Sequence, residues 1–146
     1  MAGKATILLV EDDVGDAYFL KRVLDRVLAN CALSIVSSHD EAVQYLVGEG
    51  KYADRVAHGM PSLILLDLWL AERSGLDFLQ WLKGHPQHRV IPVVVYTQDV
   101  DPADLRRAYE MGANAVIRKR LSFDAALATM KTTARFWLEE CQLVRE

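Results

Sequence analysis

The sequence predicts an α/β domain in which a parallel sheet is covered by helices on both faces. Apolar runs without polar interruption occur in the first half of residues 62–70 (SLILLDLWL) and in residues 90–96 (VIPVVVY), and they are typical of strands buried on both faces. Each predicted strand is followed by a stretch in which apolar residues recur with helical spacing. This alternation favours right-handed crossovers and therefore a parallel sheet.

Length and composition indicate one ordinary domain. The 146 residues are 51% hydrophobic, and a net charge of −3 argues against nucleic-acid binding. No apolar run approaches the roughly 20 residues that cross a bilayer. Cys31 and Cys141 fit no metal or disulfide spacing, so we expect free thiols. We therefore expect a single cytoplasmic domain over residues 1–146, without a membrane segment or an output domain.

The first half of the chain predicts two strands and two helices. The strands are expected at residues 4–10 and 32–37, and the helices from residue 14 onward and at residues 39–47. Asp13 is a suitable N-cap for the first helix, and Gly48 closes the second.

The second half predicts three further pairs of a strand and a helix. The strands are expected at residues 62–68, 90–96 and 114–118, and the helices from Ser74, Asp101 and Ser122. The last helix is expected to run from about residue 122 to residue 146. With five strands, the flavodoxin-like order 2-1-3-4-5 is the leading choice, and its switch point falls between strands one and three.

Polar residues follow four of the predicted strands. Glu11 and Asp12 follow the first, Asp67 the third, Thr97 ends the fourth and Lys119 follows the fifth. In the predicted order the three carboxylates converge at the switch point, where they would repel one another unless a cation joined them. Their hard oxygen ligands suit Mg²⁺.

This combination is typical of a phosphoryl-transfer site. A Lys ammonium and a Thr hydroxyl can hold phosphoryl oxygens while a metal ion neutralises the remaining charge. Asp67 is the best nucleophile, because it is central and aspartyl phosphates are established carboxylate chemistry. Each residue alone has an ordinary explanation as a cap, a loop hydroxyl or a surface charge, so the hypothesis depends on their conjunction.

The motifs resemble the receiver domain of two-component response regulators. The matching stretches are residues 10–13 (Val-Glu-Asp-Asp), residues 65–68 (Leu-Leu-Asp-Leu), Gly75, residues 96–97 (Tyr-Thr) and Lys119. The resemblance implies that Asp67 accepts a phosphoryl group from a histidine kinase by self-catalysed transfer and loses it slowly. It implies no other enzymatic activity.

The resemblance also implies roles for the site residues. The implied Mg²⁺ ligands are Glu11 (mainly through water), Asp12, Asp67 and the backbone carbonyl of Trp69. Thr97 would bond the phosphoryl group and shift on activation, and Lys119 would pair with that group.

Two short features are similar to those of the small regulators that serve phytochromes. One is the Glu-Asp-Asp-x-Gly-Asp opening at residues 11–16, and the other is the Phe136-Trp137-Leu138 cluster in the last helix. This closer resemblance implies that the partner is a sensor histidine kinase of the bacterial phytochrome type.

The chain departs from the receiver pattern at three positions. Arg120 stands where many receivers have Pro, often in a cis peptide, so this loop must be shaped differently. Val116 replaces a Tyr or Phe that swings inward when the Thr moves, so that coupling cannot be carried over. Trp69 places a large ring beside the site, either to slow the access of water to the acyl phosphate or as a partly exposed loop aromatic.

Two other functions stay open. A haloacid-dehalogenase-type phosphatase also uses an Asp nucleophile with Mg²⁺, but it needs a second acid two residues on, where this chain has Trp69. The other open function is a receiver-shaped interaction module that is never phosphorylated.

His85 and His88 have a metal-like spacing, but Pro86 lies between them in a predicted loop, so we expect solvated histidines.

The last helix predicts a homodimer interface. Phe136, Trp137 and Leu138 are consecutive, and at about 100° per residue they fan over roughly 200°, more than one packing face hides. A helix from residue 122 to residue 146 would be about 37 Å long, against roughly 20 Å for a typical strand. A second copy of the chain is the expected cover for the overhang.

Overall fold

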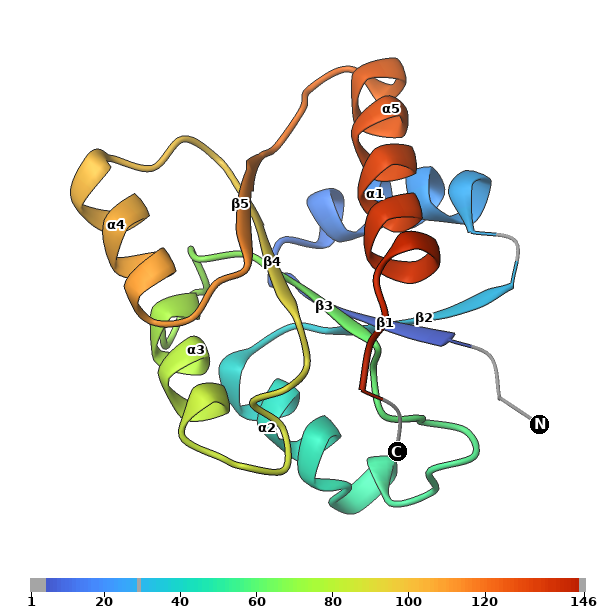
Figure 1. Cartoon of the computed structure of the whole chain (residues 1–146), viewed down its shortest axis with the longest axis vertical. Helices are drawn as coiled ribbons and strands as arrows, with labels where there is room; N and C mark the ends of the chain where they lie inside the picture. Colours follow the sequence, from blue (N-terminus) through green and yellow to red (C-terminus); the bar gives the residue numbers. More distant parts are fainter. Residues whose placement is uncertain (1–4, 29, 145–146) are drawn as a thin grey trace.

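The structure is a computed structural model that describes residues 5–28 and 30–144 (Figure 1). Within them, five parallel strands form one sheet in the order β2-β1-β3-β4-β5, which confirms the predicted fold. The strands are β1 (Ala5–Val10), β2 (Cys31–Val36), β3 (Leu63–Leu66), β4 (Val93–Thr97) and β5 (Ala115–Arg118). Lys4, where the first strand was expected to begin, lies outside the described residues.

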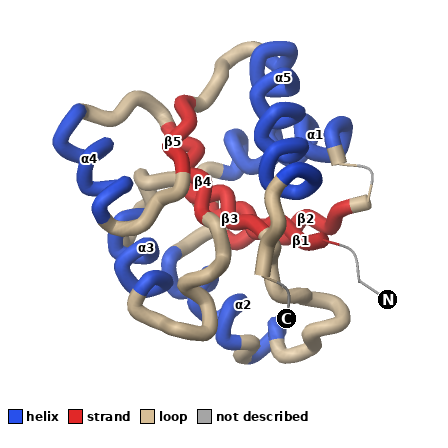
Figure 2. The backbone as a smooth tube through the Cα atoms, in the orientation of Figure 1, coloured by secondary structure: helices blue, strands red, loops and turns tan. Residues whose placement is uncertain are grey.

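The helices form two layers, one on each face of the sheet (Figure 1, Figure 2). One layer contains α1 (Val14–Val27) and α5 (Phe123–Ala134), and the other contains α2 (His39–Val47), α3 (Gly75–Lys83) and α4 (Pro102–Glu110). A short 3₁₀ helix, Gly50–Tyr52, follows α2. Among the described helices, none combines the length and the apolar character needed to cross a membrane.

The inner strands are apolar throughout because a helical layer covers each face. In β3, Ile64 and Leu66 pack on the side of α2, α3 and α4, whereas Leu63 and Leu65 pack on the side of α1 and α5. All four side chains are at most 1% exposed. Successive side chains of β3 point to opposite faces, but the sequence shows no alternation of apolar and polar residues because both faces are covered.

The pairing of β1 with β3 aligns the ends of these two strands. Val10 lies opposite Leu66, and the backbone amide of Asp67 donates to the carbonyl of Val10 at 3.0 Å. Glu11 and Asp67, the next residues along each strand, are therefore neighbours at one edge of the sheet.

Each of the described α-helices begins at a residue whose side chain accepts a hydrogen bond from the amide three residues on. These N-caps are Asp13, Ser38, Ser74, Asp101 and Ser122. The cap satisfies one of the amides that the first turn of a helix leaves without a partner. The predicted helix starts at Asp13, Ser74, Asp101 and Ser122 are confirmed.

The last helix ends earlier than predicted. It continues from α5 as a π-helical turn, Arg135–Glu140, in which the amide of Cys141 donates to the carbonyl of Phe136 at 2.9 Å. Residues 141–144 are not helical, and residues 145–146 lie outside the described part of the chain. The prediction overran because this segment contains no Gly or Pro that would mark a helix end.

The π-helical turn changes which large side chains face solvent. Phe136 is 52% exposed, which agrees with the prediction that at least one of the three residues faces outward. Trp137 and Leu138 are partly buried against the core between the sheet and the α1–α5 layer. A π-helix has more residues per turn than an α-helix, so adjacent side chains are separated by a smaller angle. Two neighbours can therefore pack on the same side, and less apolar surface is exposed than an α-helix would leave.

His88 is buried rather than solvated, so that prediction was wrong. The rings of His85 and His88 stack on Trp81, with centroid distances of 4.2 and 5.8 Å, and His88 is 5% exposed. The loop after α3 folds back on the helix, and the spacing of the two histidines reflects packing on this indole.

Gly75 allows α3 to begin against the end of β3. A Cβ atom at Gly75 would lie 2.4 Å from the carbonyl oxygen of Asp67 and 2.8 Å from the Cα atom of Leu68. Both are backbone atoms, so they can move only if the segment that carries Asp67 moves. The amide of Gly75 also donates to the carbonyl of Leu68 at 2.9 Å, which fixes this close approach.

We expect the Gly75→Ala variant to lose about 1–3 kcal/mol in free energy of unfolding, because the added methyl group overlaps fixed backbone. Urea denaturation followed by circular dichroism measures this change. Gly84→Ala, at the other end of α3, is the matched control, since its Cβ atom would lie no closer than 3.4 Å to another atom. Equal stability of the two variants would contradict the steric role of Gly75.

Candidate functional site

The structure brings the predicted polar side chains together at the carboxyl edge of the sheet. Glu11 and Asp12 follow β1, Asp67 follows β3, Thr97 ends β4 and Lys119 follows β5. Glu11, Asp67 and Thr97 are at most 5% exposed, whereas Asp12 is partly exposed. The parallel sheet produces this convergence because its strands all end on one side.

Asp67 is held by three hydrogen-bond donors. Its Oδ1 atom accepts from the hydroxyl of Thr97 at 2.7 Å and from the backbone amide of Trp69 at 2.9 Å. Its Oδ2 atom accepts from the ammonium of Lys119 at 2.8 Å. The carboxylate is therefore fixed in orientation before any ligand binds.

Lys119 binds three carboxylates at once. Its Nζ atom donates to Glu11 Oε1 at 2.6 Å, Asp16 Oδ2 at 2.8 Å and Asp67 Oδ2 at 2.8 Å. The side chain is 12% exposed, and its backbone amide donates to the carbonyl of Thr97 at 2.7 Å. Asp16, in the first turn of α1, was not among the predicted site residues.

The hydrogen bonds of Asp67 and Lys119 favour the charged form of both side chains. Burial favours the neutral form of Asp67, but hydrogen bonds from Lys119, Trp69 and Thr97 outweigh it and hold the pKa of Asp67 below its ordinary value. Burial also opposes the charge of Lys119, but its three carboxylate partners raise the pKa of Lys119 above its ordinary value. Asp67 is therefore an ionised carboxylate at neutral pH, as a nucleophile must be.

The surroundings of Glu11 disfavour its ionised form. Burial raises the pKa of Glu11 to about 7, with the charge of Asp67 adding to the effect and the hydrogen bond from Lys119 opposing it. The backbone amide of Asp13 donates to Glu11 Oε2 at 3.1 Å. The cluster thus has more negative charge than one ammonium balances, and a bound cation would relieve this excess.

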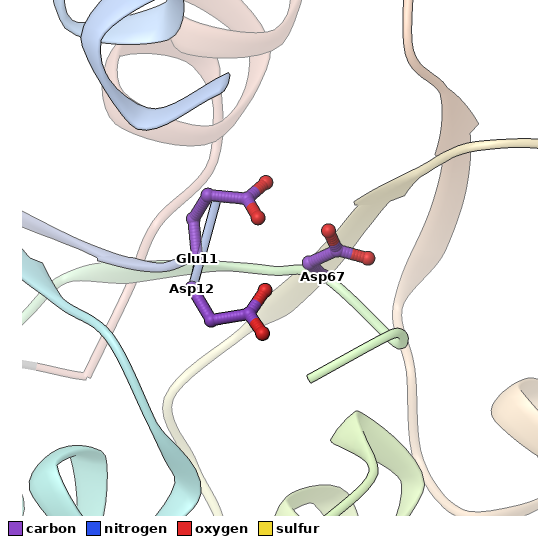
Figure 3. Close-up of side chains that lie close together, drawn as sticks. All are labelled: Glu11, Asp12 and Asp67. Atoms are coloured by element: carbon purple, nitrogen blue, oxygen red, sulfur yellow. The ribbon is translucent and has the colours of Figure 1, made fainter. Parts of the chain in front are cut away.

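Three carboxylates form a candidate metal site (Figure 3). Glu11, Asp12 and Asp67 each place an oxygen atom within 4.8 Å of the others, and Figure 3 shows the three side chains gathered beside one another. Carboxylate oxygens are the donors that Mg²⁺ and Mn²⁺ prefer. The donor set therefore fits a small divalent cation.

Trp69 follows Asp67 in a loop, and the residue is 48% exposed, as expected for a loop aromatic. Its observed contact with the site is the backbone amide that binds Asp67. A role for its carbonyl as a metal ligand, or for its ring in limiting the access of water, stays a prediction.

Two of the residues that depart from the receiver pattern donate a backbone hydrogen bond to a tyrosine hydroxyl. The amide of Arg120 donates to the hydroxyl of Tyr96 at 3.3 Å, a contact that a proline could not make. The amide of Val116 donates to the hydroxyl of Tyr109 on α4 at 3.1 Å.

A cavity of about 700 Å³ lies beside the site, between α1 and the loop that joins β5 to α5. Its wall includes Glu11, Asp16, Phe19, Lys119 and Ser122. Two members of the charged cluster, Asp16 and Lys119, therefore line this cavity on the α1 side of the sheet edge.

Curated proteins with similar sequences are regulators. The chain is 32% identical over 132 residues to the probable methanogenesis regulatory protein FilR2 of Methanothrix harundinacea, covering 90% of this chain and 83% of that protein. It is 31% identical over 137 residues to the response regulator Rcp1 of Synechocystis, covering 94% of this chain and 91% of that protein.

Solved structures with the same fold include regulators of phytochrome systems. The phosphorylated cyanobacterial phytochrome response regulator RcpA superposes with a TM-score of 0.88 at 31% identity, covering 99% of this chain and all of that one. The bacteriophytochrome response regulator AtBRR gives a TM-score of 0.76 at 32% identity over the full length of both chains. The Mn²⁺-bound form of Rcp1 gives 0.84 at 30% identity, covering 97% and 99%.

The family match spans most of the chain. Residues 7–131 match the response regulator receiver domain, and that range contains the acid pair, Asp67, Thr97 and Lys119. The fold, the order of the strands and the curated relatives agree with this match. The chain therefore belongs to the response regulator receiver family.

Proposed function

We propose that this receiver accepts a phosphoryl group on Asp67 from a histidine kinase, with Mg²⁺ bound, and signals by binding another protein. The carboxylate of Asp67 carries the proposal, because it is buried, ionised and held by three donors beside an acid pair. Receiver domains as a family are phosphoacceptors, and the family match supports the same chemistry in this chain.

The proposed transfer uses side chains that already contact Asp67. A carboxylate oxygen of Asp67 attacks the phosphorus of a phosphohistidine, and a P–O bond forms as the P–N bond breaks. The imidazole leaves with the electron pair and takes up a proton. Lys119 and Thr97, which donate to Asp67 in the free protein, are close enough to donate to phosphoryl oxygens on that residue.

Mg²⁺ is the proposed cation. Glu11, Asp12 and Asp67 would hold it, together with the backbone carbonyl of Trp69 and water. When bound, the ion neutralises charge on the phosphoryl oxygens. The Mn²⁺-bound form of Rcp1 supports a divalent-cation site in this group of proteins.

The two rival functions are less well supported. A haloacid-dehalogenase-type phosphatase needs an acid two residues after its nucleophile, and an indole at Trp69 cannot transfer protons in that way. An inert interaction module does not account for the ammonium of Lys119, which is 12% exposed and bound to Asp67. Placing such a charge out of water costs free energy that a protein-binding surface alone does not require.

With Mg²⁺ and acetyl phosphate, we expect the chain to gain the mass of one phosphoryl group, because Asp67 is an ionised and oriented nucleophile. Intact-mass spectrometry over time measures the gain. Asp67→Asn should gain nothing, and removal of Mg²⁺ with EDTA should prevent the reaction in the wild-type chain.

The same experiment separates the rivals. Turnover of acetyl phosphate without a mass gain would indicate a phosphatase. A chain that shows neither turnover nor mass gain would be an inert module, and either result would overturn the proposal.

We further propose that the kinase is a phytochrome-type sensor. The relatives Rcp1, RcpA and AtBRR support this partner, as do residues 11–16 and the Phe136–Leu138 cluster. The cytoplasmic location that the sequence predicts stays a prediction that accords with this partner.

A phytochrome histidine kinase phosphorylated with radiolabelled ATP should pass its label to this receiver faster than to an unrelated receiver at equal concentration. A gel time course measures the transfer, and Asp67→Asn is the control that should stay unlabelled. Equal rates with an unrelated histidine kinase would remove the support for a phytochrome partner.

A homodimer through the last helix is the remaining proposal. The shorter helix removes much of the predicted overhang, so the proposal now depends on the exposed ring of Phe136, which contacts Trp137 edge-on at 5.2 Å. Trp137 and Leu138 are partly buried within their own chain and would lie at the margin of such an interface.

We expect the wild-type chain to have twice the chain mass by light scattering, and Phe136→Ser to have the single-chain mass, because the change removes the exposed ring. Trp137 stays unchanged in this design, since it packs on the core. Val56→Ser, which alters a 97% exposed residue in a loop, is the control and should remain dimeric. An unaltered mass for Phe136→Ser would rule this interface out.

A further inference from the structure

We propose that Asp16 is a positioning residue that competes with the incoming phosphoryl group for Lys119 and thereby restrains phosphorylation of Asp67. The inference rests on the proposed function. It starts from the three hydrogens of the Lys119 ammonium, which are all engaged by carboxylates. Phosphorylation turns the carboxylate of Asp67 into an uncharged acyl group, so the hydrogen that Lys119 donates to Asp67 can pass to one phosphoryl oxygen. A second hydrogen for this doubly charged group becomes available only if Glu11 or Asp16 gives way.

Glu11 and Asp16 differ in what they lose by giving way. The side chain of Glu11 is 4% exposed, so water cannot replace the ammonium there. Asp16 lies in the first turn of α1 with its side chain 42% exposed, and water can solvate it at once. A half-exposed ion pair is also the weaker kind. Asp16 is therefore the partner that the phosphoryl group displaces.

Lys119 does not depend on Asp16 for its position. Two buried carboxylates hold its ammonium, and its backbone amide is bound to the carbonyl of Thr97 at 2.7 Å. Without Asp16 the ammonium should stay in place with one hydrogen available to a phosphoryl oxygen.

The charge of Asp16 acts in the same direction as its hydrogen bond. A phosphoryl group brings added negative charge next to Lys119, and a carboxylate bound to the same ammonium repels it. Asp16 is also the more exposed member of this pair, with its side chain 42% exposed against 12% for Lys119, and both residues line the cavity of about 700 Å³. Neutralising Asp16 should favour the phosphorylated form on both counts.

The test compares Asp16→Asn with the wild-type chain in Mg²⁺ and acetyl phosphate. The carboxylate of Asp67 attacks phosphorus, and acetate leaves with the electron pair of the broken P–O bond. We expect intact mass to show phosphorylation about three- to tenfold faster in Asp16→Asn, the effect of losing one partly exposed ion pair. Affinity for beryllium trifluoride, a phosphoryl mimic, should rise by a similar factor in a tryptophan fluorescence titration.

Two further variants separate this role from a general loss of charge. Asp25→Asn removes the same charge from α1, where Asp25 pairs with Lys21 at 2.7 Å, and should leave the rate unchanged. Asp16→Glu keeps a carboxylate within reach of Lys119 and should restore the slow rate. If Asp16→Asn does not fold, Asp16→Ser carries the same test.

Each remaining outcome counts against a specific claim. Phosphorylation of Asp16→Asn at the wild-type rate or below would overturn the role of Asp16 while leaving the proposed function intact. An equal acceleration in Asp25→Asn would also overturn it, because net charge would then explain the effect. A wild-type chain that accepts neither acetyl phosphate nor beryllium trifluoride would overturn the proposed function, and the inference with it.

Discussion

The ammonium of Lys119 holds the site together, because it joins residues that lie more than 100 positions apart in the sequence. It reaches from the end of β5 to the carboxylates that follow β1 and β3 and to Asp16 at the start of α1. Taking several charges out of water costs more than any one pair returns, so the arrangement is stable only as a set. Burial and the charge of Asp67 raise the pKa of Glu11, which shows that its ionised form is disfavoured in the cluster. A cation bound at this edge would stabilise the ionised form.

The sequence predicted the members of this set better than their contacts. Asp67, Thr97 and Lys119 could be placed together because strands of a parallel sheet end at one edge, and because the flavodoxin-like order was the leading choice for five alternating strands. The contact of Asp16 with Lys119 could not be predicted in the same way. It depends on the rotation of α1 about its own axis, and a polar residue in a first helical turn faces solvent equally well.

The failures of prediction share one physical cause, which is that local pattern does not report on tertiary packing. The overlong last helix followed from sequence that contains no stop signal, whereas packing of Trp137 and Leu138 on the core accompanies a π-helical turn and an end at Glu140. His88 was assigned to solvent because Pro86 indicates a loop, but that loop folds over Trp81 and buries the ring. In both places large side chains pack on other parts of the chain, and the local sequence pattern does not show this packing.

Two departures from the receiver pattern, Val116 and Arg120, lie in β5 and in the loop that follows it. Val116 has no ring to swing, and its amide is bound to the hydroxyl of Tyr109 on α4. Thr97 has a second connection that needs no aromatic partner, since its carbonyl accepts the backbone amide of Lys119 at 2.7 Å. A shift of Thr97 toward a phosphoryl group would pull on β5 through this backbone bond, and β5 is tied to α4 through Tyr109. The backbone of β4 and β5 therefore connects Thr97 to α4 without the rotation of a buried ring.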